Sequence, residues 1–316
     1  MSEERQAPEL SVIIVNYNTA ALTLDCLRVL FTEITGLSAE VFVVDNASTD
    51  ESVPAIREAF PQVRVLAMEK NLGFGAANNV AMRLAQGRYL LLLNTDAFLQ
   101  PGAVGALLAR LKQHPDVGVM GPRLLNRDSS LQRSCFRFPA PLHVWLENLW
   151  LTRLFSSRSY FGDYRDWNHA SERGVDFVIG ACMLVPRAVF EKVGGFDERF
   201  FMYQEEADWQ RRIWTAGWSV SFYPGAEVIH YGGESGRKER ARINRHFFES
   251  LDKYALKHHG IIGFLSIRTA MLIGCSLRAV LWAVAALIPG RAERAKSKAY
   301  HHARLVWRQI FTGRPA

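Results

Sequence analysis

Short apolar runs, the first of them rich in β-branched residues, alternate with segments of helical periodicity in the first part of the chain. The apolar runs cover residues 10–15, 40–45, 63–67 and 89–93. Runs that are apolar at nearly every position are typical of strands buried on both faces, as in parallel sheets. Helices are expected between them, over residues 20–32, from a cap at 48–50 to about 60, and over 75–86. The alternation predicts an α/β protein built on a doubly wound sheet.

Polar side chains follow three of these predicted strands at the point where each strand ends. Asn16, Tyr17 and Asn18 close the first run, Asp45 closes the second, and the triplet 94–96 (Asn-Thr-Asp) closes the fourth. In doubly wound sheets, ligands bind beyond the carboxyl ends of the strands. We therefore expect these side chains to line one site.

Composition narrows the class of protein. The chain has 316 residues, of which 49% are hydrophobic and 22% charged, so it can bury a large core and is not a disordered chain. The four cysteines are widely spaced, which argues against a zinc cluster and a disulfide scaffold and favours a reducing cytosol. The polar, acidic N-terminus is unlike a secretory signal.

The formal charge of +7 is unevenly distributed, because basic residues dominate after position 236 and the rest is slightly acidic. We therefore predict two domains, an α/β domain over 1–236 and a helical, membrane-associating region over 237–316. Within the latter, residues 269–288 have the length of a membrane span but carry Arg278 at their centre. A span and a packed core helix stay open as alternatives. An amphipathic helix lying in the plane of an anionic membrane is favoured, because it avoids burying Arg278 in lipid.

Basic residues in this tail are interleaved with a long apolar run rather than with stacking aromatic residues. A nucleic-acid partner is therefore not predicted. Residues 123–175 are rich in Arg, Phe and Trp but weakly periodic. We expect loops and short helices there, which cover the site and select its substrates.

Asp96 is the first candidate for chemistry. A carboxylate at the end of a buried strand, with the Asn94 amide beside it, offers oxygen ligands to a hard divalent cation. Such a cation would bridge a diphosphate and offset the charge that develops on a leaving phosphate. The alternative is that Asp96 only caps a helix that starts near Pro101.

A glycine-rich stretch, residues 71–79, leads into the third predicted helix. Asn71, Gly73 and Asn78 belong to it, and such a turn lets the backbone approach a ligand closely. A role in packing alone is an equal alternative. Asp50, which precedes the second helix, is better explained as a cap.

The densest acidic cluster contains Glu205, Glu206 and Asp208 and is flanked by aromatic residues, among them Tyr203 and Trp209. A carboxylate in a partly buried, aromatic wall has a raised pKa and can act as a general base. A solvent-exposed helix face is the alternative.

His230 ends a strand-like run and precedes a Gly-Gly turn, which makes it a candidate metal ligand, although a lone histidine is often structural. Arg237, Lys238 and Arg240 follow, and their positive charges suit a diphosphate.

Together these segments resemble the family 2 inverting glycosyltransferases of the GT-A fold, and their rhamnosyltransferase-like branch in particular. The resemblance covers roughly residues 9–236. The segments that carry it are SVIIVNYN (11–18), VVDNASTD (43–50), NLGFGAANN (71–79), LLLNTDAFL (91–99), GACMLVPRAVFEKVGGFDERFFMYQEEADWQRR (180–212) and VIHYGGES (228–235). Their order along the chain makes the resemblance specific.

For the donor side, the resemblance implies that Asp45 contacts the nucleotide base and that Asn16, Tyr17 and Asn18 lie nearby. Asp96 would be the metal-binding acid of the family's Asp-x-Asp motif, with His230 as a further ligand and Mn²⁺ or Mg²⁺ as the ion. The motif opens here with Asn94 rather than an acid, so metal binding would depend on Asp96 and His230.

For the acceptor side, Glu206 inherits the position of the catalytic base, and Trp209 and Tyr203 would form the acceptor wall. The family usually has Asp at this position, and a longer side chain shifts the carboxylate by about a bond length. Glu205 and Asp208 therefore stay open as alternative bases.

The implied reaction is a single in-line displacement, which moves a sugar from a nucleotide diphosphate donor with inversion. The resemblance suggests a dTDP- or UDP-linked donor, with a deoxysugar such as rhamnose. The cationic, apolar tail suggests a glycolipid or polyprenyl-linked acceptor at the cytoplasmic face of the cell membrane, in cell-wall or polysaccharide assembly. A non-catalytic sugar-nucleotide-binding scaffold of the same fold is the alternative, based on Asn94 and Glu206.

Overall fold

The computed structural model describes residues 7–156, 160–164, 167–232, 240–288 and 292–311. It divides into two compact units, one of residues 1–138 with 167–247, and one of residues 139–166 with 248–316. The predicted boundary at 236/237 falls outside the described residues and stays a prediction. Residues 139–166 group with the C-terminal helices rather than with the α/β part.

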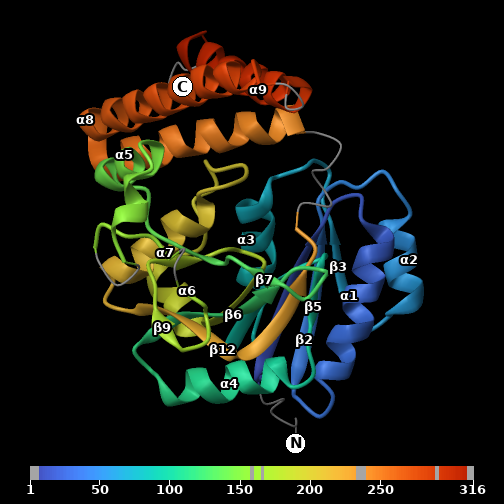
Figure 1. The fold of residues 1–316 in the computed structure, drawn as a ribbon. Helices are drawn as coiled ribbons and strands as arrows, with labels where there is room; N and C mark the ends of the chain where they lie inside the picture. Colours follow the sequence, from blue (N-terminus) through green and yellow to red (C-terminus); the bar gives the residue numbers. More distant parts are fainter. Residues whose placement is uncertain (1–6, 157–159, 165–166, 233–239, 289–291, 312–316) are drawn as a thin grey trace, which may run out of the picture. The chain divides into compact units, whose positions relative to one another are not determined.

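The first unit is built on a sheet whose N-terminal half is parallel (Figure 1). Four strands lie in the order β3-β2-β1-β4 and pair in parallel. They are β1 (Leu10–Asn16), β2 (Ala39–Asp45), β3 (Arg64–Ala67) and β4 (Tyr89–Asn94). These strands coincide with the four predicted apolar runs, and the doubly wound α/β fold is confirmed.

The second half of the sheet is mixed, because β11 runs antiparallel to both β4 and β6, and β12 antiparallel to β5. Beyond β4 the order is β11-β6-β12-β5, with β7 paired to β6 and β9 to β12. These strands are β5 (Ala97–Leu99), β6 (Val117–Leu125), β7 (Leu131–Gln132), β9 (Arg173–Gly174), β11 (Cys182–Pro186) and β12 (Ser219–His230). A separate two-stranded sheet joins β8 (Cys135–Phe136) and β10 (Phe177–Val178).

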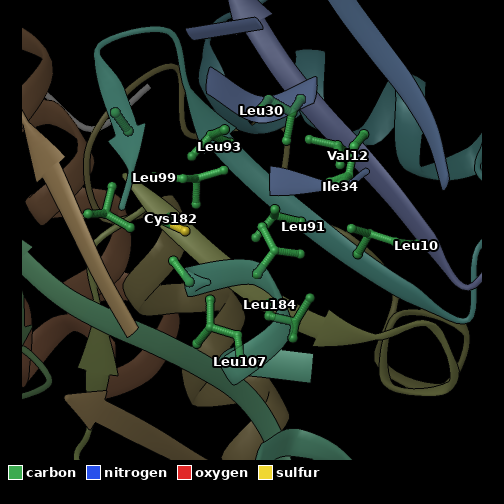
Figure 2. Close-up of a cluster of buried hydrophobic side chains, with 14 of the residues drawn as sticks. Leu10, Val12, Leu30, Ile34, Leu91, Leu93, Leu99, Leu107, Cys182 and Leu184 are labelled. Carbon is green, nitrogen blue, oxygen red and sulfur yellow. The ribbon is translucent and has the colours of Figure 1, made fainter. Parts of the chain in front are cut away.

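One face of the sheet is covered by α1 (Ala20–Glu33), α2 (Ser52–Ala59) and α4 (Ala103–Gln113). Figure 2 shows this core, in which Leu30 and Leu107 pack against alternate strand residues such as Val12, Leu91 and Leu184. Alternate strand positions point to the same face, so a fully apolar strand serves two cores at once. This explains why the runs of β1, β2 and β4 lack a polar alternation, whereas β3, at the edge of the sheet, has no fully buried residue.

The remaining helices of this unit are α3 (Phe74–Leu84), α6 (Arg187–Val193) and α7 (Glu205–Thr215). Gln210 of α7 contacts Met183, whose neighbours Cys182 and Leu184 belong to the opposite core. Helix α7 therefore packs on the face of the sheet opposite to α1, α2 and α4. The acidic cluster forms the first turn of this helix.

The second unit contains α5 (Pro141–Asn148), a 3₁₀ turn at Leu151–Leu154, α9 (Ala292–Phe311) and, from residue 248 on, α8 (Arg240–Ala285). Helix α8 is kinked at Gly260, whose φ of 63° and ψ of −169° are accessible to glycine. By length and composition alone, residues 245–285 are long and apolar enough to cross a membrane.

Candidate active site

Three polar strand ends meet at one edge of the parallel sheet, as predicted. Asn16 on β1 lies in register with Asp45 on β2, and Val15 with Asn94 on β4. Because the pairing is parallel, all three carboxyl ends lie at the same edge. The sheet geometry thus brings the predicted donor-side residues together.

Asp45 is held in a fixed orientation at this edge. Its side chain is buried; Oδ1 accepts a hydrogen bond from Asn16 Nδ2 at 2.7 Å and Oδ2 one from the Ser48 backbone N–H at 3.0 Å. The side-chain oxygen of Asn16, Oδ1, accepts hydrogen bonds in turn from the hydroxyls of Thr19 and Thr23, at 2.8 and 2.7 Å. Such a network fixes the orientation of the Asp45 side chain at the edge of the sheet.

The loop after β1 is stabilised by its own polar groups. Asn18 has a left-handed φ of 52° and is exposed, and its Oδ1 accepts the Thr49 backbone N–H at 2.7 Å. Tyr17 is half-buried beside it. Asp50 accepts the backbone N–H groups of Ala20 and Ser52 at 3.1 Å each, so it caps the starts of α1 and α2. The capping role predicted for Asp50 is confirmed.

In the glycine-rich stretch, Asn71 and Gly73 shape a turn rather than an open loop. The Asn71 Oδ1 accepts hydrogen bonds from Asn46 Nδ2 and from the Gly73 backbone N–H, both at 2.9 Å. A Cβ at Gly73 would lie 2.2 Å from the carbonyl oxygen of Phe201, and the φ of 85° is left-handed. Only glycine lets the start of α3 approach the segment that leads into the acidic helix.

The prediction that Asn78 binds the nucleotide sugar is not supported. Asn78 is 1% exposed, and its Nδ2 donates to the Phe74 carbonyl one helical turn earlier. The side chain is therefore occupied within α3. Its neighbour Asn79 was missed, although it joins α3 to the turn before α7, because its Oδ1 accepts the Phe196 N–H and its Nδ2 donates to the Phe196 carbonyl.

Asp96 and His230 meet across the pairing of β5 with β12. His230 lies opposite Ala97 in this antiparallel pair, which brings its Nε2 to 3.3 Å from Asp96 Oδ1. Both side chains are at most a tenth exposed. The alternative role of Asp96 as a helix cap is wrong, because the next helix begins at Ala103 with Gly102 as its cap.

These two side chains fit a divalent cation. A carboxylate and an imidazole are ligands that Mn²⁺ accepts, and Gln132 Oε1 holds the other ring nitrogen, Nδ1, at 2.7 Å. Among the described residues, no group of three or more His, Cys, Asp or Glu side chains is placed to hold a metal. A cation here would therefore need further oxygen ligands, such as those of a diphosphate.

The acidic cluster begins helix α7 at a strained turn. Tyr203 and Gln204 both have left-handed φ angles, of 67° and 65°, which cost non-glycine residues about 1–3 kcal/mol each. Glu205 and Glu206 then lie in the first turn of the helix, where the helix dipole favours negative charge. Strain of this kind is usually found where a site requires a particular orientation.

Glu205 and Glu206 are buried carboxyls with an unusual environment. Burial raises the pKa of both groups, and the Glu206 carboxylate raises the pKa of Glu205 further. One oxygen of each, Oε2, is buried and accepts no hydrogen bond from the described residues. The backbone N–H of Gly180 binds Glu206 and partly offsets the rise in its pKa.

Glu206 is thereby placed next to the Asn94–Asp96 motif. The residue after Gly180, Ala181, accepts the Asn94 backbone N–H at 2.9 Å. Glu206 is also only partly covered, whereas Glu205 is 4% exposed. A carboxyl with a raised pKa, in a residue that is less buried than its neighbour Glu205, has the properties of a general base.

Asp208 has a different environment. It is fully buried, and its Oδ2 pairs with Arg212 Nε at 2.9 Å. Arg212 also donates to the carbonyls of Val193 and Gly195, at 3.1 and 2.6 Å. This network fastens α7 to the turn that ends α6.

The prediction that Trp209 forms an acceptor wall is wrong. Trp209 is 0% exposed, its Nε1–H donates to the Gly194 carbonyl at 2.7 Å, and its ring packs 4.5 Å from that of Phe196. A core side chain offers no surface to an acceptor. Tyr203 is half-buried at the strained turn and stays a candidate for the acceptor side.

Residues 237–239 lie outside the described residues, as does the side chain of Arg240. The predicted diphosphate clamp of Arg237, Lys238 and Arg240 therefore stays a prediction. Gln132, which lies in the weakly periodic stretch 123–175, was not identified from the sequence. Its contact with His230 depends on the pairing of strands far apart in the chain, and a single sequence does not reveal that pairing.

The sequence profile of glycosyl transferase family 2 matches residues 11–194, more than half of the chain, and includes the strand ends described above. The chain belongs to glycosyl transferase family 2. The resemblance predicted from the motifs is thereby confirmed.

Relatives and solved structures agree with this membership. The chain is 31% identical over 268 residues to N-acetylglucosaminyl-diphospho-decaprenol L-rhamnosyltransferase of Mycobacterium tuberculosis, a match that covers 75% of this chain and 84% of the relative. It is 25% identical to a low-salt glycan biosynthesis hexosyltransferase of Haloferax volcanii, over 72% of this chain and 69% of the relative.

Two solved glycosyltransferase structures confirm the predicted GT-A fold. A mannosyltransferase from Pyrobaculum calidifontis in complex with GDP-Man and Mn²⁺ has a TM-score of 0.57 at 16% identity, covering 98% of this chain and 89% of its own. A GalNAc transferase with UDP, GalNAc and Mn²⁺ has a TM-score of 0.58 at 15% identity, covering 95% of this chain and 55% of its own.

Proposed function

We propose that this chain is an inverting, divalent-metal-dependent hexosyltransferase that transfers L-rhamnose from a nucleotide diphosphate donor to a polyprenyl-diphosphate-linked N-acetylglucosamine. The pairing of Asp96 with His230 at the edge that holds Asp45 and Asn94 is the observation that carries the metal–diphosphate assignment. The sugar and the acceptor are supported by the activity of the mycobacterial relative, an N-acetylglucosaminyl-diphospho-decaprenol L-rhamnosyltransferase.

In this proposal the nucleotide base lies near Asp45, and Asp96 and His230 would hold Mn²⁺ or Mg²⁺. When bound, the cation would offset negative charge on the leaving diphosphate. Glu206 accepts the proton of the acceptor hydroxyl. The hydroxyl oxygen forms a bond to the anomeric carbon as the bond from that carbon to the phosphate oxygen breaks, and the electron pair leaves with the nucleoside diphosphate.

Glu206 is preferred over the other two acids on the basis of their contacts. Asp208 is engaged with Arg212 and has no exposed surface. Glu205 is more deeply buried than Glu206, and only Glu206 is bound by the backbone N–H of Gly180 among the described residues. Glu206 therefore combines a raised pKa with the greater exposure of the two residues.

The test is turnover of purified full-length protein with dTDP-rhamnose, UDP-linked sugars and a short-chain polyprenyl-diphosphate N-acetylglucosamine, with and without Mn²⁺. Metal-dependent transfer of rhamnose with inverted configuration is expected. Turnover with another sugar only would replace the donor assignment. Nucleotide-sugar binding without turnover of any sugar would instead support the scaffold alternative.

For localisation, we infer that the second unit binds the cytoplasmic membrane surface through one side of α8. Its large apolar side chains are 38–81% exposed, and we call them the α8 apolar face: Ile261, Ile262, Leu265, Ile273, Leu277, Val280, Leu281 and Val284. Ile273, Leu277, Val280 and Val284 follow one another at intervals of three and four residues, the spacing of one helix face. An exposed stripe of this kind fits the acyl boundary of a bilayer.

Arg278 supports the in-plane arrangement over a span. Its Nη1 donates to Asn148 Oδ1 at 3.0 Å, and its guanidinium lies 4.9 Å from the ring centre of Trp150. Arg278 is thus bound to α5 and the following turn, away from the apolar face. A helix lying in the membrane plane keeps this contact and avoids placing the charge in hydrocarbon.

Vesicle flotation tests the inference. The full chain should float with anionic phosphatidylglycerol vesicles, and the double substitution of Val280 and Leu281 by Glu should weaken binding about 30-fold, from about 2 kcal/mol of lost burial. Leu84→Glu is the matched control, because Leu84 is 43% exposed on α3 of the other unit. Equal flotation of the double variant, or resistance of the wild type to alkaline extraction, would contradict in-plane binding.

A further inference from the structure

Gln132 contacts His230 with both ends of its side-chain amide. The Oε1 lies 2.7 Å from His230 Nδ1, and the Nε2 donates to the His230 backbone carbonyl at 2.9 Å. The same Nε2 donates to Asn126 Oδ1 at 2.9 Å. Gln132 therefore fixes the ring and the backbone of His230 together.

Backbone carbonyls determine which way these amides point, because a carbonyl can only accept. Asn126 Nδ2 faces the carbonyl of Leu131 at 3.3 Å, so its Oδ1 must face Gln132. Gln132 Nε2 then lies between two acceptors, Asn126 Oδ1 and the His230 carbonyl. A flipped Gln132 amide would place its oxygen against both, so Oε1 is the atom that faces His230 Nδ1.

The orientation of Gln132 sets the tautomer of His230. Because Gln132 Oε1 can only accept, His230 Nδ1 must carry the hydrogen. In the neutral ring, Nε2 then has a lone pair, and this nitrogen lies 3.3 Å from Asp96 Oδ1. Two electron-rich atoms at this separation, both shielded from solvent, suit a shared cation.

The geometry assigns Gln132 as a positioning residue that holds His230 in the Nδ1–H tautomer and aims its Nε2 at a divalent cation shared with Asp96. The inference rests on the proposed metal-dependent function. The antiparallel pairing of β7 with β6 supplies the rigid support, since Leu124 lies in register with Gln132. Removing a hydrogen bond that orients a metal-binding histidine commonly lowers metal affinity by about 10–100-fold.

The first test determines the tautomer of His230 by NMR, and it requires neither bound metal nor enzyme activity. The full chain is labelled with ¹⁵N on histidine side chains, and the His230 signals are assigned by their absence in His230→Ala. At mildly alkaline pH the wild type should show the Nδ1–H pattern. Nε2–H in the wild type would overturn the inference.

The second test measures binding of Mn²⁺ alone by the electron paramagnetic resonance signal of free Mn²⁺. Gln132→Met should weaken binding about 10–100-fold. Gln132→Glu keeps an acceptor for Nδ1–H and should bind more tightly than Gln132→Met. Gln113→Met, an exposed change at the end of α4, is the matched control.

The outcomes separate this inference from the proposed function. If Asp96→Ala and His230→Ala bind Mn²⁺ as the wild type does, the proposed metal site is wrong. If those two lose binding while Gln132→Met equals its control, only the role of Gln132 is wrong. Equal losses in Gln132→Met and Gln132→Glu would indicate packing rather than positioning, and circular dichroism confirms that each variant is folded.

Discussion

Replacing Asp208 by Asn and Glu206 by Gln should separate the structural acid from the general base. Breaking one side of a buried ion pair costs about 3–5 kcal/mol when the remaining charge is left unpaired. Arg212 keeps two carbonyl acceptors, and a quarter of its side chain is exposed. We therefore expect Asp208→Asn to lose about 2 kcal/mol of unfolding free energy in urea, below the full cost.

Glu206→Gln should behave in the opposite way. The substitution removes a buried carboxylate whose Oε2 accepts no hydrogen bond from the described residues, so stability should be unchanged or slightly higher. Loss of a general base lowers turnover by about 10²–10⁴-fold. The assay is kcat with saturating donor, acceptor and Mn²⁺, alongside urea unfolding of the same samples.

The pH dependence of stability adds a second readout of the same carboxyls. Burial raises the folded-state pKa of Glu205 and Glu206, so the folded state binds more protons than the unfolded state above the unfolded pKa, about 4.3. Stability should therefore fall as pH rises from there through the folded-state pKa. Replacing both residues by Gln should flatten this fall.

The assignment has a clear refutation. A variant Asp208→Asn that keeps its stability but loses turnover, together with Glu206→Gln that keeps turnover, would make Asp208 the base. If Glu205→Gln alone abolished turnover, the base would be Glu205. A pH profile of stability that is unchanged in the double variant would contradict the raised pKa values.

Two further predictions concern the strand ends and the turn before α3. Asp96→Ala should abolish Mn²⁺-dependent turnover, whereas Asn94→Ala should only reduce it, because the amide carries no charge; equal losses would contradict the unequal roles. Gly73→Ala should lower the urea midpoint by more than Gly36→Ala, since both have left-handed φ but only Gly73 meets backbone, at the carbonyl of Phe201. We expect about 1 kcal/mol for Gly36→Ala and at least about 2 kcal/mol more for Gly73→Ala, and equal losses would contradict the close approach.

The parallel strands could be predicted from the sequence because their burial is encoded locally. A run such as residues 10–15 is apolar at nearly every position, and this pattern is rare outside two-sided burial. Polar residues at the ends of such runs must then lie at one edge. Asn16, Asp45 and Asn94 were placed together by this reasoning, and the register of the sheet agrees.

The roles within the acidic helix could not be predicted in the same way. Glu206, Asp208 and Trp209 are nearly adjacent in sequence, yet Glu206 is partly exposed, Asp208 pairs with Arg212 and Trp209 belongs to the core. Successive helix positions differ by about 100° in direction, so the environment of each depends on what packs against α7. The family resemblance identified this segment as functional, but it did not show which role each residue in the segment has.

The sequence by itself determined an α/β chain with one polar edge, because hydrophobic periodicity fixes which faces of each element are buried. The family resemblance paired His230 with Asp96, but the tertiary structure alone decided that Gln132 holds His230 and that Arg278 is bound away from the α8 apolar face. These contacts join residues far apart in the chain, and their partners are set by strand register and helix packing. Neither strand register nor helix packing can be deduced from the local pattern of residues.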